Sequence, residues 1–167
     1  ANLLLQLYGD GFEQVLVMPF DRIMTALGRG EADAGLIIHE SRFTYRQFGF
    51  CEVLDLGGWW EGLTGLPIPL GGILARRDLG ARTIGAVDAA IRASLEYARA
   101  HPAEPRAYIR RHAQELDDAV IDAHIGLYVN DFSLDLGEQG LSAIETLLRR
   151  AEARGLIPAA SQPLFAA

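Results

Sequence analysis

A β-strand buried on both faces is predicted by the sequence Ala32-Asp33-Ala34-Gly35-Leu36-Ile37-Ile38, which closes on a continuous apolar run. Three further short apolar segments are strand candidates, at residues 15–19, 53–56 and 73–75. Helical patterns lie between them, and one of these is a short helix that Asp21 is expected to cap. Because strands that alternate with helices form mainly parallel sheets with crossover connections, the expected fold class is α/β.

From about residue 80 onward the pattern is helical only. Apolar residues recur at spacings of three and four up to Pro102, which predicts a helix there. Further helices are predicted at 105–115, from a cap at Asp117 or Asp118 to 129, and at 138–154. These helices need a β-sheet to pack on, and the part of the chain beyond about residue 80 contains no candidate strand for one. We therefore predict a small α/β lobe at residues 1–76 and the helical part of a second lobe at residues 77–167.

The first eight residues have the pattern of the middle of a helix, and no capping residue precedes them. The chain is therefore expected to begin inside a longer protein, with an upstream segment completing the lobe to which residues 77–167 belong. Without that segment, the piece alone is expected to lack useful activity, unless another chain supplies the upstream part.

Composition excludes several classes of protein. The chain has 167 residues, of which 50% are apolar and 22% charged, and its formal charge of −7 disfavours a nucleic-acid-binding surface. All 15 basic residues are Arg, which excludes a Schiff-base lysine and a phosphate-binding loop with its lysine. Cys51 is the single cysteine, so Cys-ligated zinc is excluded. No run is long enough for a membrane helix, and the expected location is the cytoplasm.

His39 is the first candidate for chemistry. It directly follows the predicted strand 32–38, and ligands of open α/β sheets bind at the carboxyl ends of strands. A histidine there, next to Glu40, can act as a general base near neutral pH. The alternative is a histidine that caps the next helix or binds a loop carbonyl. The other three, His101, His112 and His124, lack metal-ligand spacing and are interpreted as structural.

The pair Trp59-Trp60 is the second informative feature. Two adjacent Trp side chains on a strand cannot both point into one small core, so one of them is expected to line a cleft. The alternative is that each Trp lies in the core of a different lobe. The Gly- and Pro-rich segment 64–72 is interpreted as a rigid crossing between lobes. Asn2, at a helix start, can present free N–H groups to a carboxylate. The arginine pairs at 76–77 and 110–111 are given no functional role.

The sequence Gly35-Leu36-Ile37-Ile38-His39-Glu40-Ser41-Arg42-Phe43-Thr44-Tyr45 resembles the signature of the 1,4-dihydroxy-6-naphthoate synthase family, from the futalosine route to menaquinone. The resemblance continues in order along the chain. It includes Asp55-Leu56-Gly57-x-Trp59-Trp60-Glu61, Thr64-Gly65-Leu66-Pro67-x-Pro69-Leu70-Gly71, His112-Ala113-Gln114-Glu115, Tyr128-Val129-Asn130-x-Phe132-Ser133 and Gly155-Leu156.

This resemblance implies a type II periplasmic-binding-protein-like fold of two α/β lobes, here the second lobe plus the C-terminal helical part of the first. It implies a lyase that converts cyclic dehypoxanthine futalosine to 1,4-dihydroxy-6-naphthoate without a metal or organic cofactor. His39 aligns with the general base. Ala1 matches the second member of a carboxylate-binding Thr-Ala pair, with Asn2 beside it and the Thr missing. Trp59 is expected to pack on the substrate's bicyclic ring.

Two other functions stay open at this point. Chorismate dehydratase shares the fold, although it usually lacks the histidine-containing run. A non-enzymatic solute-binding protein would have the same two lobes, but it would not need a base at residue 39. The expected partner in the favoured interpretation is a small aromatic carboxylate, with neither nucleic acid nor a membrane involved.

Overall fold

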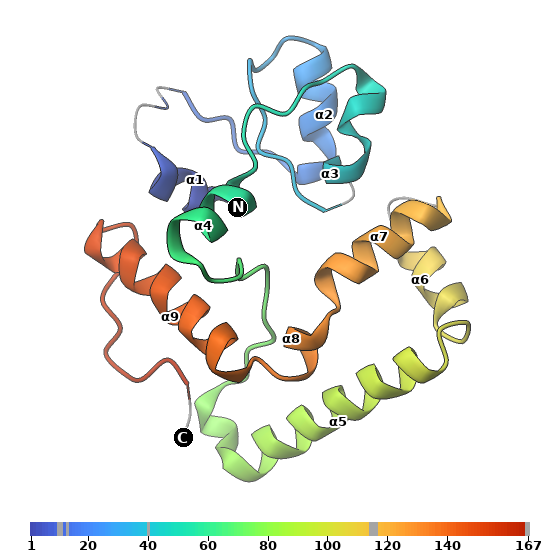
Figure 1. The fold of residues 1–167 in the computed structure, drawn as a ribbon, viewed down its shortest axis with the longest axis vertical. Coiled ribbons are helices and arrows are strands. Elements are labelled where there is room, and N and C mark those ends of the chain that lie inside the picture. The colour runs from blue at the N-terminus through green and yellow to red at the C-terminus, as the bar shows by residue number, and fades with distance from the viewer. Residues whose placement is uncertain (10–11, 13, 40, 114–116, 166–167) are drawn as a thin grey trace. The chain divides into compact units, whose positions relative to one another are not determined.

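The computed structural model describes residues 1–9, 12, 14–39, 41–113 and 117–165. The chain forms two compact units, one made of residues Ala1–Pro69 and Gly137–Ala167 and the other of residues Leu70–Leu136. Their boundaries differ from those of the two predicted lobes, which stay a prediction. Each unit is described by itself, and Figure 1 labels the helices of both.

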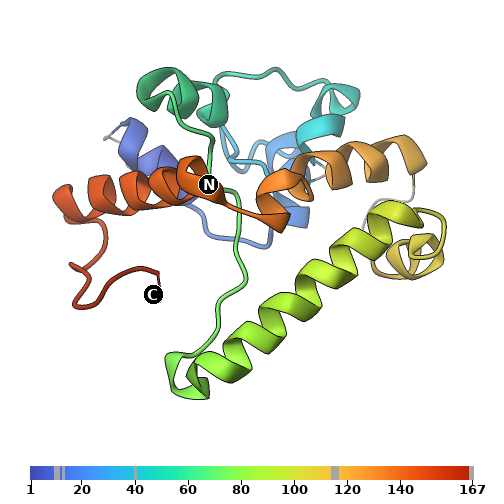
Figure 2. The ribbon, with the colours of Figure 1, turned by 60° about the horizontal axis from the view of Figure 1, so that its bottom comes forward.

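Three helices form the better packed part of the first unit. They are α1 (Asn2–Tyr8), α4 (Leu56–Thr64) and α9 (Gly137–Ala153), and α1 contacts both of the others. The two views in Figures 1 and 2 show α1 beside α4. Their buried side chains are Leu4, Leu7, Trp60, Ala143 and Ala151. Burial of Trp60, with no exposed surface, makes the largest single contribution to this core.

The rest of the first unit is built around α2 (Phe20–Gly28), which contacts the 3₁₀ helix η1 (Tyr45–Phe48). The short helix α3 (Ser41–Thr44) leads directly into η1. Gly35 lies against α2 so closely that a Cβ there would come within 2.7 Å of Ile23 and 2.8 Å of Leu27. The segment that precedes residue 39 is therefore held on α2 by a contact that only glycine permits.

The second unit contains α5 (Gly80–Ala100), α6 (Arg106–His112), α7 (Asp118–Tyr128), α8 (Asp131–Leu134) and the 3₁₀ helix η2 (Arg77–Leu79). α5 contacts η2 and α8, and Arg99 Nη1 lies 3.0 Å from Asp131 Oδ1. Together with α9, these helices confirm the helical pattern predicted beyond residue 80. The cap predicted at Asp117 or Asp118 is Asp117, whose carboxylate accepts from the backbone N–H groups of Ala119 and Val120.

The four predicted strands are not found: the described residues contain helices, turns and irregular segments but no β-strand. Leu56 of the expected strand 53–56 is instead the first residue of α4. Val17 and Leu74, in two others, are each 94% exposed. A β-strand forms only when its backbone N–H and C=O groups bind those of a neighbouring strand. Among the described residues, no such strand lies beside these segments. The expected α/β class is therefore not seen, and the described chain is mostly helical.

Two smaller expectations concern helix starts. The helix predicted at the beginning of the chain is α1, which starts after Ala1 without a side-chain cap, as its sequence indicates. The expected cap of α2 by Asp21 is wrong, because the helix begins one residue earlier and Pro19 occupies the cap position. Asp21 lies in the first turn, where a negative charge still favours the helix dipole. Among the described residues, no helix is both long and apolar enough to cross a membrane.

Replacing Asp55 tests the local stability of α4. Its Oδ1 accepts from Gly57 N at 2.9 Å, and its Oδ2 lies 3.2 Å from Arg42 Nη2. We expect Asp55→Ala to lower the free energy of unfolding by about 1 kcal/mol, the usual value of such a cap. Asp55→Asn is the matched control, because it keeps the capping oxygen and removes only an exposed ion pair. Equal losses for both variants in urea unfolding would contradict the capping role.

Arg110 and Asp118 form an exposed ion pair within the second unit. Arg110 donates from Nε to Asp118 Oδ1 at 3.1 Å, and this hydrogen bond is the main reason why the pKa of Asp118 is lowered. A lowered folded-state pKa contributes stability above the unfolded pKa, and this contribution is lost as pH falls through the folded value. We expect Arg110→Gln to raise the Asp118 pKa in an NMR titration, whereas Arg111→Gln, whose guanidinium lies over Tyr108, leaves it unchanged.

Candidate active site

His39 occupies a backbone conformation that side chains rarely adopt. Its φ of 55° is the positive value recorded for a non-glycine residue in the described part of the chain. Its carbonyl accepts from Arg42 N at 3.3 Å, at the start of α3. Left-handed conformations cost a non-glycine residue about 1–2 kcal/mol, although histidine is among the residues that tolerate them best. Such conformations cluster at functional sites, so this one supports a functional role for His39.

The imidazole of His39 is half-buried against the first residue of α2. Its ring centre lies 4.9 Å from that of Phe20, with the ring planes inclined by 60°. The close packing of Gly35 on the same helix fixes the approach of the segment. The predicted place at the end of a strand is wrong, because no strand forms there, but His39 still stands where an irregular segment turns into a helix. Glu40 lies outside the described residues.

The two tryptophans lie on α4 rather than on a strand, and their environments differ. Trp60 is fully buried, and its Nε1 donates to the carbonyl of Pro67 at 3.2 Å. Trp59 is half-exposed and meets Tyr8 edge to face, with ring centres 5.4 Å apart. The two side chains therefore do not share one environment, but they lie on a helix and not on the strand from which the expectation of a cleft was argued.

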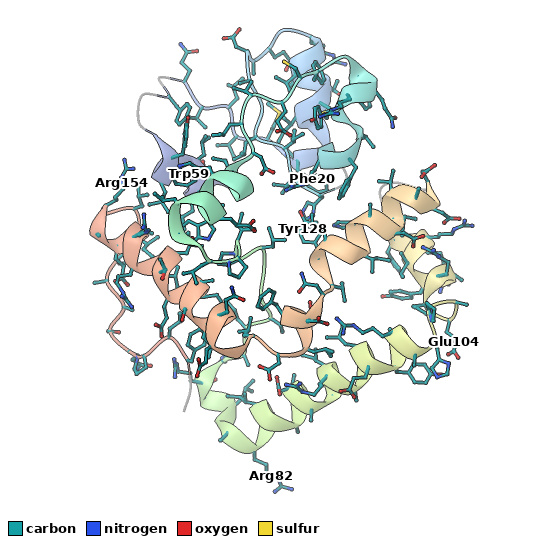
Figure 3. All side chains as sticks on the ribbon, in the orientation of Figure 1. Phe20, Trp59, Arg82, Glu104, Tyr128 and Arg154 are labelled. Carbon is teal, nitrogen blue, oxygen red and sulfur yellow. The ribbon has the colours of Figure 1, made fainter. Side chains whose placement is uncertain are left out.

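Trp59 lines a pocket within the first unit whose volume is about 320 Å³. Figure 3 labels two of its residues, Trp59 on α4 and Arg154 just beyond the end of α9. The full lining is Leu7, Trp59, Trp60, Arg150, Ala153 and Arg154. The two arginines were missed by sequence reasoning. The signal that points to them is their separation of four residues at the end of α9, since residues spaced in this way lie near each other on a helix.

Ala1 and Asn2 lie at the start of α1, and the Ala1 carbonyl accepts from Leu5 N at 3.1 Å. Both residues are exposed. The opposite end of α1 supplies Leu7 to the pocket and Tyr8 to the contact with Trp59. Of the four predicted site residues, Trp59 alone lines this pocket. The structure therefore places the helix of Asn2 beside the helix of Trp59, and His39 in a different environment beside Phe20.

The other three histidines each pack on a tyrosine of the same helix or its end. The ring centres lie 4.4 Å apart for Tyr97 and His101, and 4.5 Å apart for both Tyr108 with His112 and His124 with Tyr128. Ring contacts at such separations support the structural interpretation of these histidines. A search of the described residues finds no cluster of three or more His, Cys, Asp or Glu side chains that could hold a metal ion.

Known proteins resemble this chain over most of its length. A family model described as menaquinone biosynthesis matches residues 1–153. A 1,4-dihydroxy-6-naphthoate synthase of Thermus thermophilus is 57% identical over 99% of the chain, and one of Streptomyces coelicolor is 54% identical over 89%. The chain spans 60% and 53% of the lengths of these two relatives.

A solved structure shows the same fold. The crystal structure of an Archaeoglobus fulgidus protein superposes on 94% of the chain with a TM-score of 0.88 and 41% identity, and the match covers 59% of that protein. The family model covers far more than half of the chain, and both relatives are well above the identity at which homology is certain. The chain belongs to the menaquinone biosynthesis family.

Proposed function

We propose that the protein is a lyase that converts cyclic dehypoxanthine futalosine to 1,4-dihydroxy-6-naphthoate. The observation that carries this proposal is the identity of 57% and 54% to two relatives that bear the name of that synthase. The corresponding fold is the type II periplasmic-binding-protein-like arrangement of two lobes, and the corresponding compartment is the cytoplasm, where small-molecule precursors of this kind are made.

His39 is the general base of the proposed reaction. Its imidazole removes a proton from the carbon next to the bond that breaks, and the electron pair left behind becomes part of the new aromatic ring. The pair of the broken C–C bond leaves with the departing fragment, which takes up a proton in turn. Aromatisation supplies driving force, and a positioned base contributes about 10²–10⁴ in rate. The left-handed backbone of His39 supports this assignment, because strain of that kind is usual at active sites.

Substrate binding is assigned to Ala1, Asn2 and Trp59. N–H groups in the first turn of a helix attract a carboxylate, and the start of α1 has no side chain that satisfies them. The half-exposed indole of Trp59, held edge to face by Tyr8, offers a flat apolar surface to a bicyclic ring. Both elements belong to helices in contact with each other, α1 and α4.

Product analysis with two substrates tests the proposal. The purified full-length protein is incubated separately with cyclic dehypoxanthine futalosine and with chorismate, and the products are identified by mass spectrometry. We expect 1,4-dihydroxy-6-naphthoate from the first substrate and unchanged chorismate from the second. Dehydration of chorismate would overturn the proposal in favour of the sister reaction. No turnover of either, combined with thermal stabilisation by amino acids or sugars, would identify a solute-binding protein instead.

A further inference from the structure

Phe20 is the aromatic residue against which the imidazole of His39 packs. It is the first residue of α2, directly after Pro19, and it is labelled at that end of the helix in Figure 3. Its ring centre lies 4.9 Å from that of His39, with the two ring planes inclined by 60°. Both side chains are half-buried. Ring centres about 4.5–7 Å apart are typical of attractive aromatic pairs, so this contact restrains the imidazole.

One side of α2 carries the segment that leads to His39. Phe20, Ile23 and Leu27 are spaced by three and four residues, so their side chains lie on the same side of the helix. A Cβ added at Gly35 would come within 2.7 Å of Ile23 and 2.8 Å of Leu27, so the backbone of the segment lies directly on this side. The apolar row on α2 therefore meets the segment twice, at Gly35 and at His39.

The chain that follows His39 is also held on α2. The helix contacts η1, which comes directly after α3. A Cβ added at Gly28, the last residue of α2, would lie 3.9 Å from the ring of Phe50. The positive φ of His39 persists only where the surrounding structure determines it, and packing on α2 both before and after this residue does so. The backbone of His39 is thus fixed, and the direction of its side chain depends on what the imidazole packs against.

A general base must be positioned as well as basic. Its nitrogen has to lie within hydrogen-bond reach of the proton that it removes, at about 2.6–3.2 Å between heavy atoms. A displacement of about 1 Å can cost a factor of about 10² in rate. An imidazole turns about its Cα–Cβ and Cβ–Cγ bonds, and a ring packed against it restricts both rotations. Phenylalanine suits this task because its ring neither donates nor accepts the proton.

We propose that Phe20 is a positioning residue for His39, whose ring holds the imidazole in the orientation from which it removes the proton. This inference rests on the proposed function, because it assigns Phe20 a part in that reaction. Phe20 takes part in no bond-making step and acts through its contact with the imidazole. Its aromatic ring is therefore expected to set the rate of the chemical step without changing substrate binding.

Steady-state kinetics of full-length variants at residue 20 test the inference. Phe20→Leu keeps an apolar side chain at the start of α2 and removes the aromatic ring. We expect its kcat for cyclic dehypoxanthine futalosine to fall about tenfold or more, with KM within about twofold and a thermal melt close to that of the unmodified protein. Phe20→Tyr keeps the ring and is expected to restore kcat to within about twofold of the unmodified value. Phe48→Leu is the matched control, because it makes the same change at a phenylalanine that is 61% exposed and is expected to leave both constants unchanged.

An NMR signal of the imidazole gives a readout that does not depend on turnover. The ring current of Phe20 shifts the Cε1–H resonance of His39, which is identified by its absence from the spectrum of His39→Asn. We expect this resonance to move in Phe20→Leu and to keep its position in Phe48→Leu. An unmoved resonance in Phe20→Leu would overturn the inference, because the two rings would then not be in contact in solution.

The outcomes separate the inference from the proposed function. Unchanged kcat in Phe20→Leu, beside a His39→Asn variant that has lost turnover, would overturn the inference and leave the proposed lyase intact. Equal losses of kcat in Phe20→Leu and Phe20→Tyr would also overturn it, since the aromatic ring would then not be what matters. So would a loss that accompanies a lowered thermal stability, which would show a structural role instead. No product from the unmodified full-length protein would overturn the proposed function, and the inference with it.

Discussion

Replacing His39 by alanine in the full-length protein is expected to abolish most product formation while substrate binding stays near normal. The rate of conversion of cyclic dehypoxanthine futalosine should fall by about 10²–10⁴, because that is the usual contribution of a positioned general base. The substrate dissociation constant should change little, since the proposal assigns the carboxylate and the ring to other residues. Rapid-quench kinetics for the rate and calorimetry for the dissociation constant measure the two effects separately.

The left-handed backbone conformation of His39 makes a second variant at this position necessary. At a φ of 55°, alanine is more strained than histidine, and part of its effect would be structural. Asparagine tolerates this conformation well and has no basic nitrogen, so His39→Asn isolates the loss of the base. His101→Ala is the matched control, because this exposed histidine packs on Tyr97 and is interpreted as structural. Undiminished product formation by His39→Asn would contradict the assignment.

Replacing Trp60 by alanine is expected to cause the largest loss of stability. The indole is fully buried among helices α1, α4 and α9, and its removal leaves a cavity that these helices cannot close. Substitutions of this kind cost about 3–5 kcal/mol. In a domain of ordinary stability this is a large part of the free energy of unfolding, so the urea midpoint should fall steeply.

Trp60→Phe separates packing from hydrogen bonding. Phenylalanine keeps most of the buried apolar surface but leaves the carbonyl of Pro67 without its donor. We expect a loss of about 1–3 kcal/mol, from the smaller ring and the unpaired carbonyl together. If Trp60→Ala and Trp60→Phe were equally mild, the core around α4 would not depend on this side chain as the structure indicates.

Helices could be predicted from the sequence because their signals are local. The spacing of Ile84, Val87 and Ile91 predicts α5, and a carboxylate at Asp117 marks the start of α7. Strands could not be predicted in the same way. The run that ends at Ile38 is apolar enough for a strand, but a strand also needs partners that a local pattern does not show. Leu56 shows the competing effect, since the cap at Asp55 turns an expected strand end into a helix start.

In the candidate site too, residues with local sequence signals could be predicted and residues that meet only in the fold could not. His39 and Trp59 were found because motifs around them are continuous in the sequence. Arg150 and Arg154 were missed because they are far from Trp59 in the sequence and meet it only when α9 packs beside α1 and α4. Contacts of this range depend on the fold as a whole, so neither composition nor spacing near Trp59 contains them.

Chemical rescue of His39→Ala in the full-length protein by free imidazole tests the central claim most directly. If the side chain of His39 acts by accepting a proton, added imidazole can take over that step in the space left by the missing ring. The account predicts a very slow variant whose rate of 1,4-dihydroxy-6-naphthoate formation rises in proportion to imidazole concentration, with no rise in equal concentrations of a salt. A variant that matches the unmodified protein without any added base, or that no concentration of imidazole accelerates, would contradict it.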